Sequence, residues 1–257
     1  MEISKEERYR DLVKRARASY PIYDDTQEPS KDELYWCKEC NEINLWTYWQ
    51  GRGHLNARLM LVGQDWGHPW DSSCEGFMKK VENTVPGPVP NYMEGNTNPT
   101  DNNLKILFSE LHKDISKPCE DLFFTNFVLG YRTGKISGNF KKAWADKDSE
   151  HFKELVNIIE PKVVLCLGRS TYEAVMQALE PDKKPLIRRY NAFIESKDNP
   201  RTVYLESGKE LAVFALAHCG AIGTMNRNRG RKVGDRLELQ REDWGRVGHY
   251  LTANQYI

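Results

Sequence analysis

The stretch that decides the fold is LMLVGQDWGH, residues 59–68. Four apolar residues lead directly into a glycine, which is followed by an amide, a carboxylate, an indole and an imidazole. The apolar run is typical of a strand buried on both faces, as in a parallel sheet. Open α/β folds bind their ligands at the edge where such strands end. Asp65 is therefore a candidate site carboxylate, and the alternative is that it caps a turn or a helix start.

Outward from this stretch, apolar strands alternate with amphipathic helices. Further strands are expected at 122–128, 163–167 and 211–217, with a weaker one near 202–205 at the sheet edge. Apolar residues at helical spacing predict helices at 4–20 and near 104–111, 152–159, 172–179 and 240–253. This order predicts an α/β fold with three layers, α/β/α, around a central, mostly parallel four-stranded sheet.

Two segments are expected along the chain. Residues 58–257 would form the α/β domain, and residues 1–57 would pack on its core. Ser4 and Glu7 have the spacing of a capping box at the start of the first helix. The aromatic residues between 35 and 49 are interpreted as packing against the sheet. The alternative is a stacking platform for single-stranded nucleic acid.

Composition and charge limit the function classes. The chain has 257 residues and a formal net charge of +0, so no global basic field attracts it to nucleic acid. No apolar stretch approaches the roughly 20 residues that span a bilayer. The charged N-terminus lacks the apolar region of a signal peptide, which predicts a cytoplasmic protein without a membrane partner.

A basic segment at 227–241 is the local exception, with six basic against two acidic residues. We expect Arg227, Arg229, Arg231 and Lys232 to contact DNA phosphates beside the site. Such contacts would weaken as salt is added. The alternative is a solvated charged segment with no partner.

The cysteine pattern offers one candidate metal site. Cys37 and Cys40 have the CxxC spacing that supplies half of a zinc site. His54, Cys74 and Cys119 are possible further ligands, but none has a second diagnostic spacing. The alternative is a pair of idle thiols. The other cysteines are scattered, which argues against a disulfide framework in a reducing compartment.

Polar residues stand at the ends of three expected strands. Gln64 and Asp65 follow the first, Asn126 lies near the end of the second, and His218 follows the fourth. In a parallel sheet all of these side chains would gather at one edge. A carboxylate that activates water, an amide that reads a ring edge and an imidazole that stabilises negative charge favour hydrolysis with a hydrogen-bonding ring as the leaving group. The alternative treats each residue alone: Asn126 would form hydrogen bonds with a neighbouring loop, and His218 would be a core histidine with its hydrogen bonds satisfied.

The order of these motifs resembles the uracil-DNA glycosylase superfamily. The resemblance covers roughly residues 58–230. Each motif is modest by itself, but the ordered set is fairly specific. The segment at 61–68 resembles the first catalytic motif, and 124–128 resembles the base-recognition strand. The segment at 160–168 is similar to a recurrent helix-proline-strand-glycine unit, and 217–218 is similar to the start of the last motif.

The resemblance implies a DNA glycosylase that cleaves the N-glycosidic bond of a flipped uracil or related deaminated base. Asp65 would activate the attacking water, Asn126 would read the base, and His218 would stabilise the leaving base. Gln64 would contact the base or its phosphate through its backbone, and Phe77 would stack on the base. The reaction requires no cofactor, and the partner is DNA that contains the damaged base.

The chain also departs from the family. His218 is followed by Cys219-Gly220 in place of Pro-Ser, and Trp66-Gly67 replaces a turn that commonly contains proline. Residues 127–130 contain no cysteine, so we expect no iron-sulfur cluster. These departures keep open a catalytically weak or inactive nucleic-acid-binding relative with the same fold. The neutral net charge keeps open a third possibility, a protein that acts on free nucleotides.

Overall fold

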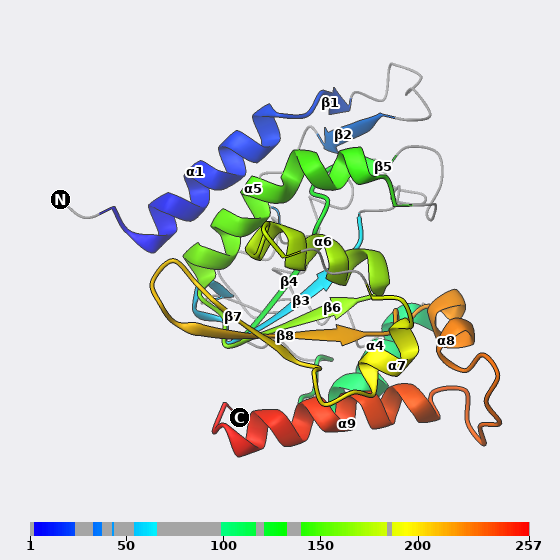
Figure 1. The fold of residues 1–257 in the computed structure, drawn as a ribbon. Coiled ribbons are helices and arrows are strands. Elements are labelled where there is room, and N and C mark those ends of the chain that lie inside the picture. The colour runs from blue at the N-terminus through cyan, green and yellow to red at the C-terminus, as the bar shows by residue number, and fades with distance from the viewer. Residues whose placement is uncertain are drawn as a thin grey trace.

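The computed structural model describes residues 3–23, 33–37, 43, 54–65, 99–116, 121–132, 140–183 and 187–256. These residues form a five-stranded sheet in the order β4-β3-β6-β8-β7 (Figure 1). Its strands are β3 (Leu59–Gly63), β4 (Leu122–Asn126), β6 (Val163–Leu167), β7 (Arg201–Tyr204) and β8 (Glu210–Leu216). The first four in the spatial order are parallel, and β7 runs antiparallel to β8 at the edge. The expected four-stranded sheet is therefore corrected to five strands, because the weak strand near 202–205 extends the edge.

Helices cover both faces of this sheet, which is consistent with a three-layer α/β/α arrangement (Figure 1). One face carries α1 (Lys5–Ala18), α5 (Lys142–Ile159) and α6 (Arg169–Leu179), and the other carries α4 (Pro99–Ser109) and α9 (Glu238–Ala253). Three short helices were not expected from the sequence, namely η1 (His54–Asn56), α7 (Tyr190–Ile194) and α8 (Ala221–Arg227). A small separate sheet joins β1 (Ile22–Tyr23), β2 (Leu34–Cys37) and β5 (Tyr131–Arg132).

The side chains of the central strands alternate between two cores. On β3, Met60 and Val62 pack in the core beneath α1, α5 and α6. Leu59 and Leu61 pack in the core beneath α4 and α9. Successive residues of a strand point to opposite faces, so a run of apolar residues is needed where helices cover both. The continuous apolar strands expected from the sequence are confirmed.

The first helix begins where its sequence predicts. Ser4 caps α1 by accepting from the Glu7 backbone N–H, and the Glu7 side chain accepts from the Ser4 backbone N–H. Apolar residues of α1, among them Leu12, join the same core as the sheet. Lys5 adds a polar tie, because its Nζ lies 3.0 Å from the carbonyl oxygen of Ile159 at the end of α5.

The direction of the chain connections reverses between two neighbouring strands. The chain passes from β3 to β4 on one side and from β6 to β8 on the other. In open α/β sheets, the crevice outside the carboxyl ends of the strands at such a reversal is the usual ligand site. Gln64 and Asp65 follow β3 directly, so they stand at this position. In Figure 1, α8 lies at the end of the molecule towards which β6 and β8 point.

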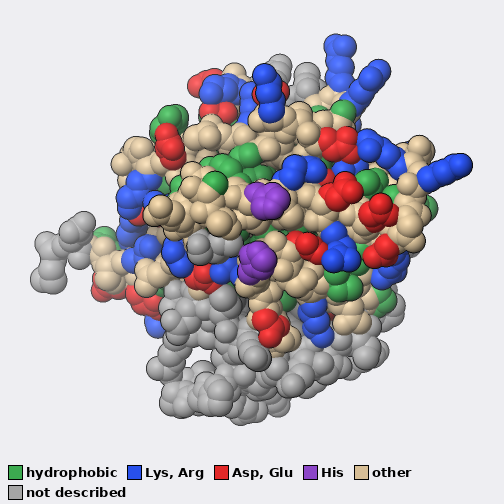
Figure 2. Space-filling view, turned by 90° about the horizontal axis from the view of Figure 1, so that it is seen from below, with side chains coloured by type: hydrophobic (Ala, Val, Ile, Leu, Met, Phe, Trp, Pro, Cys, Tyr) green, Lys and Arg blue, Asp and Glu red, His purple; other side chains and the backbone are tan. Residues whose placement is uncertain are grey.

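The outer surface carries charges of both signs. On the face at the α9 side, Lys and Arg side chains lie among Asp and Glu side chains (Figure 2). This mixture agrees with the net charge of +0. Over the described ranges, no helix combines the length and the apolar character needed to cross a membrane.

Candidate active site

Three of the expected site residues gather at the carboxyl edge of the sheet. Gly63, at the end of β3, pairs with Asn126, at the end of β4. β8 runs parallel to β6, and the chain leaves its end through Ala217 into His218. The charge of Asp65 acts on His218, so the end of β3 and the end of β8 are within electrostatic reach of each other.

Asn126 occupies space that a side chain at Gly63 would need. A β-carbon at Gly63 would lie 2.1 Å from Oδ1 of Asn126, far inside van der Waals contact. The glycine therefore allows the carboxamide to lie against β3, and Asn126 is 9% exposed. The backbone continues this contact, because the Phe127 N–H donates to the Gly63 carbonyl at 2.9 Å. Gly63 thus fixes where Asn126 can present its amide.

Asp65 is held by its neighbour. The side-chain amide of Gln64 donates to Oδ2 of Asp65 at 2.7 Å. The Gln64 carbonyl accepts from the Val128 N–H, so the segment after β3 is pinned to the segment after β4. Gln64 therefore has a second role that the sequence did not predict, because it orients the carboxylate.

His218 is held in one neutral form. Its Nδ1 accepts a hydrogen bond from the Gly220 N–H at 2.9 Å, so the neutral ring carries its proton on Nε2. The residue as a whole is exposed, but the surrounding protein partly desolvates the ring and lowers the pKa of His218 below its usual value. The Asp65 carboxylate opposes this and raises the pKa. A neutral imidazole with an Nε2–H donor can stabilise negative charge on a leaving group.

Three buried polar side chains hold the turn that carries His218. Gln240 of α9 donates to the His218 carbonyl at 3.1 Å, and Asn103 of α4 donates to the Cys219 carbonyl at 2.6 Å. The Thr224 hydroxyl of α8 lies 2.7 Å from Oε1 of Gln240. Sequence reasoning did not select these residues. The available signal was a polar Gln240 in the buried stripe that continues with Trp244, Val247 and Leu251.

α8 packs closely beneath this turn. A β-carbon at Gly223 would lie 2.1 Å from the carbonyl oxygen of His218. Any larger residue there would push α8 away from the His218 backbone. The glycine therefore sets how near α8 comes to the site.

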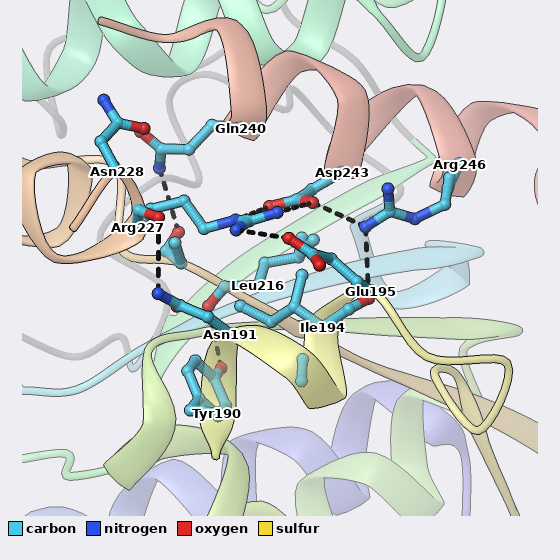
Figure 3. Close-up of polar contacts among 12 residues, drawn as sticks. Tyr190, Asn191, Ile194, Glu195, Leu216, Arg227, Asn228, Gln240, Asp243 and Arg246 are labelled. Atoms are coloured by element: carbon cyan, nitrogen blue, oxygen red, sulfur yellow. Dashed lines mark hydrogen bonds and ion pairs between the residues drawn. The ribbon is translucent and has the colours of Figure 1, made fainter. Parts of the chain in front are cut away.

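Arg227 does not belong to the exposed basic segment, which corrects the sequence expectation. Its side chain is 1% exposed and points inward to Asp243 and Glu195 (Figure 3). Nε lies 2.6 Å and Nη2 lies 2.8 Å from the two carboxylate oxygens of Asp243. Nη1 lies 2.9 Å from Oε1 of Glu195. Both carboxylates and the burial exclude contact between this guanidinium and a DNA phosphate.

The other arginines of the basic segment differ in what they contact. Arg231 is exposed but pairs with both carboxylate oxygens of Glu195 at 2.8 and 2.9 Å. Arg229 is exposed and reaches only the side-chain oxygen of Asn226 within the described contacts. Lys232 is exposed as well. Arg229 and Lys232 are therefore the cations of this segment that stand most open to an anionic partner.

The remaining expected site residues lie outside the described part of the chain. Phe77 and Cys40 belong to undescribed ranges, and for Cys37 only the backbone is described, in β2. The zinc expectation therefore stays a prediction. Among the described residues there is no group of three His, Cys, Asp or Glu side chains that could hold a metal ion. Cys219, next to His218, is buried, and this burial raises the pKa of its thiol to about 12.

Compared with known proteins, the chain matches no protein-family model and no curated relative. The resemblance to the uracil-DNA glycosylase superfamily rests on the sequence motifs alone.

Proposed function

We propose that this protein is a DNA glycosylase that hydrolyses the N-glycosidic bond of an extruded uracil or a related deaminated base. The observation that carries the proposal is that Asp65, Asn126 and His218 stand at the carboxyl ends of parallel strands, so that they share one edge of the sheet. There the Asp65 carboxylate raises the pKa of His218, whose Nδ1 accepts from the Gly220 N–H. The Asp65 carboxylate can accept a proton from water, and the His218 imidazole can stabilise negative charge on the leaving base. The proposal includes the specific fold of the uracil-DNA glycosylase superfamily, which is a finer statement than the α/β arrangement described above.

In the proposed reaction, water attacks the anomeric carbon of the sugar as the bond to the base breaks. The Asp65 carboxylate orients this water, accepts its proton and stabilises positive charge on the sugar. The bonding electron pair leaves with the base. Nε2–H of His218 donates to the base oxygen on which negative charge builds up.

Asn126 would recognise the base. Its carboxamide presents one acceptor and two donor hydrogens, which suits the Watson–Crick edge of a pyrimidine. The contact with Gly63 limits the positions that this amide can adopt. A fixed amide discriminates between bases better than a mobile one, because a wrong partner leaves its polar groups unpaired.

The surface beside the site also fits DNA. Ile222 and Met225 of α8 are 66% and 61% exposed, although both are apolar. They lie a few residues beyond His218, on the helix whose polar residues Thr224 and Arg227 are buried. Proteins that open base stacks commonly place apolar side chains against the bases. Such contacts would offset part of the few kcal/mol that base extrusion costs.

Base release from uracil-containing oligonucleotides tests the proposal. Single- and double-stranded substrates are incubated with protein in excess, and abasic sites are measured. We expect release by the wild type and its loss in Asp65→Asn, with an unchanged circular dichroism spectrum. Equal release by Asp65→Asn would remove Asp65 from the water-activating role.

The residues after His218 favour a second candidate, a nucleic-acid-binding relative without catalysis. In that case DNA binding would fall as salt is added, but no base would be released from uracil, hypoxanthine or xanthine substrates.

A further inference from the structure

We propose that Gln240 is a positioning residue that sets the orientation and tautomer of His218. It rests on α9, 22 residues beyond His218, and is 1% exposed. Its amide nitrogen lies 3.1 Å from the His218 carbonyl and 3.4 Å from the Ala217 carbonyl. The catalytic part of this inference rests on the proposed function, but the effect on the His218 ring does not.

The chemistry of its neighbours fixes which way the Gln240 amide points. Carbonyl oxygens only accept hydrogen bonds, so the NH₂ group must face Ala217 and His218. The Oε1 atom then faces the Thr224 hydroxyl, 2.7 Å away, which must donate to it. Because that hydroxyl is 3.2 Å from the Gly220 carbonyl, its nearer acceptor is Gln240. Thr224 therefore holds the Gln240 amide in the orientation in which its NH₂ group donates to the Ala217 and His218 carbonyls.

Four successive carbonyls of the turn are held from outside it. Gln240 holds those of Ala217 and His218, and Asn103 holds that of Cys219. The Gly220 carbonyl accepts from the Thr224 backbone N–H at 3.0 Å. A buried polar network that is satisfied in this way rigidifies the segment it binds. The turn therefore has little freedom to rotate.

This rigidity reaches the imidazole through one hydrogen bond. The Gly220 N–H points at Nδ1 of His218 only while the backbone from 218 to 220 keeps its conformation. That bond places the proton on Nε2. If Gln240 releases the His218 carbonyl, the turn relaxes, the bond weakens and both neutral tautomers become populated.

The test compares three single variants. Gln240→Met keeps the length of the side chain and removes its hydrogen bonds. Thr224→Val keeps the shape of Thr224 and removes the hydroxyl that orients Gln240. Val247→Ala is the matched control, because Val247 is a buried residue of the same helix that packs against the sheet. All three are destabilising, so a general loss of stability affects the control as well.

The first readout is the ¹⁵N NMR spectrum of the His218 ring over a pH titration. In the wild type and in Val247→Ala we expect the Nε2–H tautomer and a pKa below the usual value. In Gln240→Met we expect a mixture of tautomers and a shifted pKa, with a smaller effect in Thr224→Val. A wild-type His218 spectrum in Gln240→Met would overturn the proposal, whether or not the protein is a glycosylase.

The second readout separates chemistry from binding. In single-turnover base release, Gln240→Met should be slower by about tenfold to a hundredfold, because small misplacements of a catalytic group cost that much. Its affinity for DNA should stay unchanged. Rates equal in Gln240→Met and Val247→Ala would show that Gln240 contributes only stability. No release by any form, with the His218 spectrum altered, would reject the proposed function and retain the positioning role.

Discussion

At the scale of single residues, the site depends on atoms that close contacts hold in place. Asn126 rests against a glycine, Asp65 accepts from Gln64, and His218 accepts from Gly220. In each case the partner is a neighbour in the sheet or in the same turn. Single substitutions should therefore change the chemistry and leave the fold intact.

Base choice should depend on Asn126. In Asn126→Asp one oxygen replaces the donor nitrogen, so we expect loss of discrimination between uracil and cytosine. Competitive base-release assays with both bases in matched oligonucleotides measure this. Gly63→Ala is expected to have the same effect indirectly, because its methyl group would collide with the carboxamide. Unchanged discrimination in Asn126→Asp would remove Asn126 from base reading.

Acid sensitivity should come in part from His54. Its ring packs against Tyr9 and Phe123 with both nitrogens buried, and this desolvation lowers its pKa. The unfolded chain then takes up a proton more readily than the folded protein. Stability should fall as pH drops through about 6.5, the usual histidine pKa, and stop falling below the lowered pKa of the folded state.

His54→Phe should remove this contribution. Both ring nitrogens are buried without a hydrogen-bond partner among the described residues, so we expect a gain of about 1 kcal/mol in the free energy of unfolding at pH 7.5. The gain should be larger at pH 5. Urea unfolding at both pH values measures it, with His249→Gln, on the exposed side of α9, as the control. A gain that does not change with pH would contradict the assignment.

At the scale of elements, α8 buries polar side chains and exposes apolar ones. Thr224 and Arg227 are buried, whereas Ile222 and Met225 are exposed. Because α8 buries no large apolar side chain, hydrogen bonds and ion pairs must hold it against the rest of the protein. Arg227 supplies most of them, because it joins α8 to Asp243 of α9 and to Glu195 at the end of α7.

Asp243→Asn should therefore loosen α8. Removing one member of a buried ion pair leaves the other charge uncompensated, which costs about 3–5 kcal/mol. We expect a loss near the lower end, because Glu195 still pairs with Arg227. Arg231→Ala is the matched control, because it removes a pair with Glu195 that is exposed and should cost about 1 kcal/mol or less. Equal losses in chemical denaturation would refute the special role of the buried pair.

At the scale of the whole molecule, the N-terminal helix is part of the main core. Leu12 is fully buried and shares its core with β3, β4 and α5. We expect Leu12→Ala to lower the free energy of unfolding by about 2–5 kcal/mol in a single cooperative transition. Lys14→Ala, on the exposed side of α1, should change it by about 0.5 kcal/mol or less. A separate early transition in Leu12→Ala would mean that α1 unfolds on its own.

A formal net charge of +0 provides no global attraction to DNA, so the DNA binding that the proposed function requires should depend on a few local cations. The double variant Arg229→Ala, Lys232→Ala should bind a uracil-containing duplex more weakly. Its slope of log affinity against log salt should fall by about 1–2, since each phosphate contact contributes about 0.9. Arg241→Ala should change little, because Arg241 is paired with Glu110. Equal slopes in the wild type and the double variant would exclude this segment from the interface.

The sequence alone determined the elements whose signal is local. Apolar runs predicted the four parallel strands, helical spacing predicted the long helices, and Ser4 with Glu7 predicted the start of α1. The same patterns brought Asp65, Asn126 and His218 to one edge, because the ends of parallel strands must meet there. Each of these inferences needs only the chain's own periodicity.

Only the tertiary structure decided which polar groups are buried and what they bond. Arg227 and Arg229 lie two positions apart in one basic run, yet one is sealed between two carboxylates and the other is exposed. Gln240 and Asn103 lie on helices far from His218 in sequence and reach its turn only when those helices pack. A sequence reveals whether a residue is polar, whereas its hydrogen-bond and ion-pair partners depend on which side chains the packing of the helices brings close together.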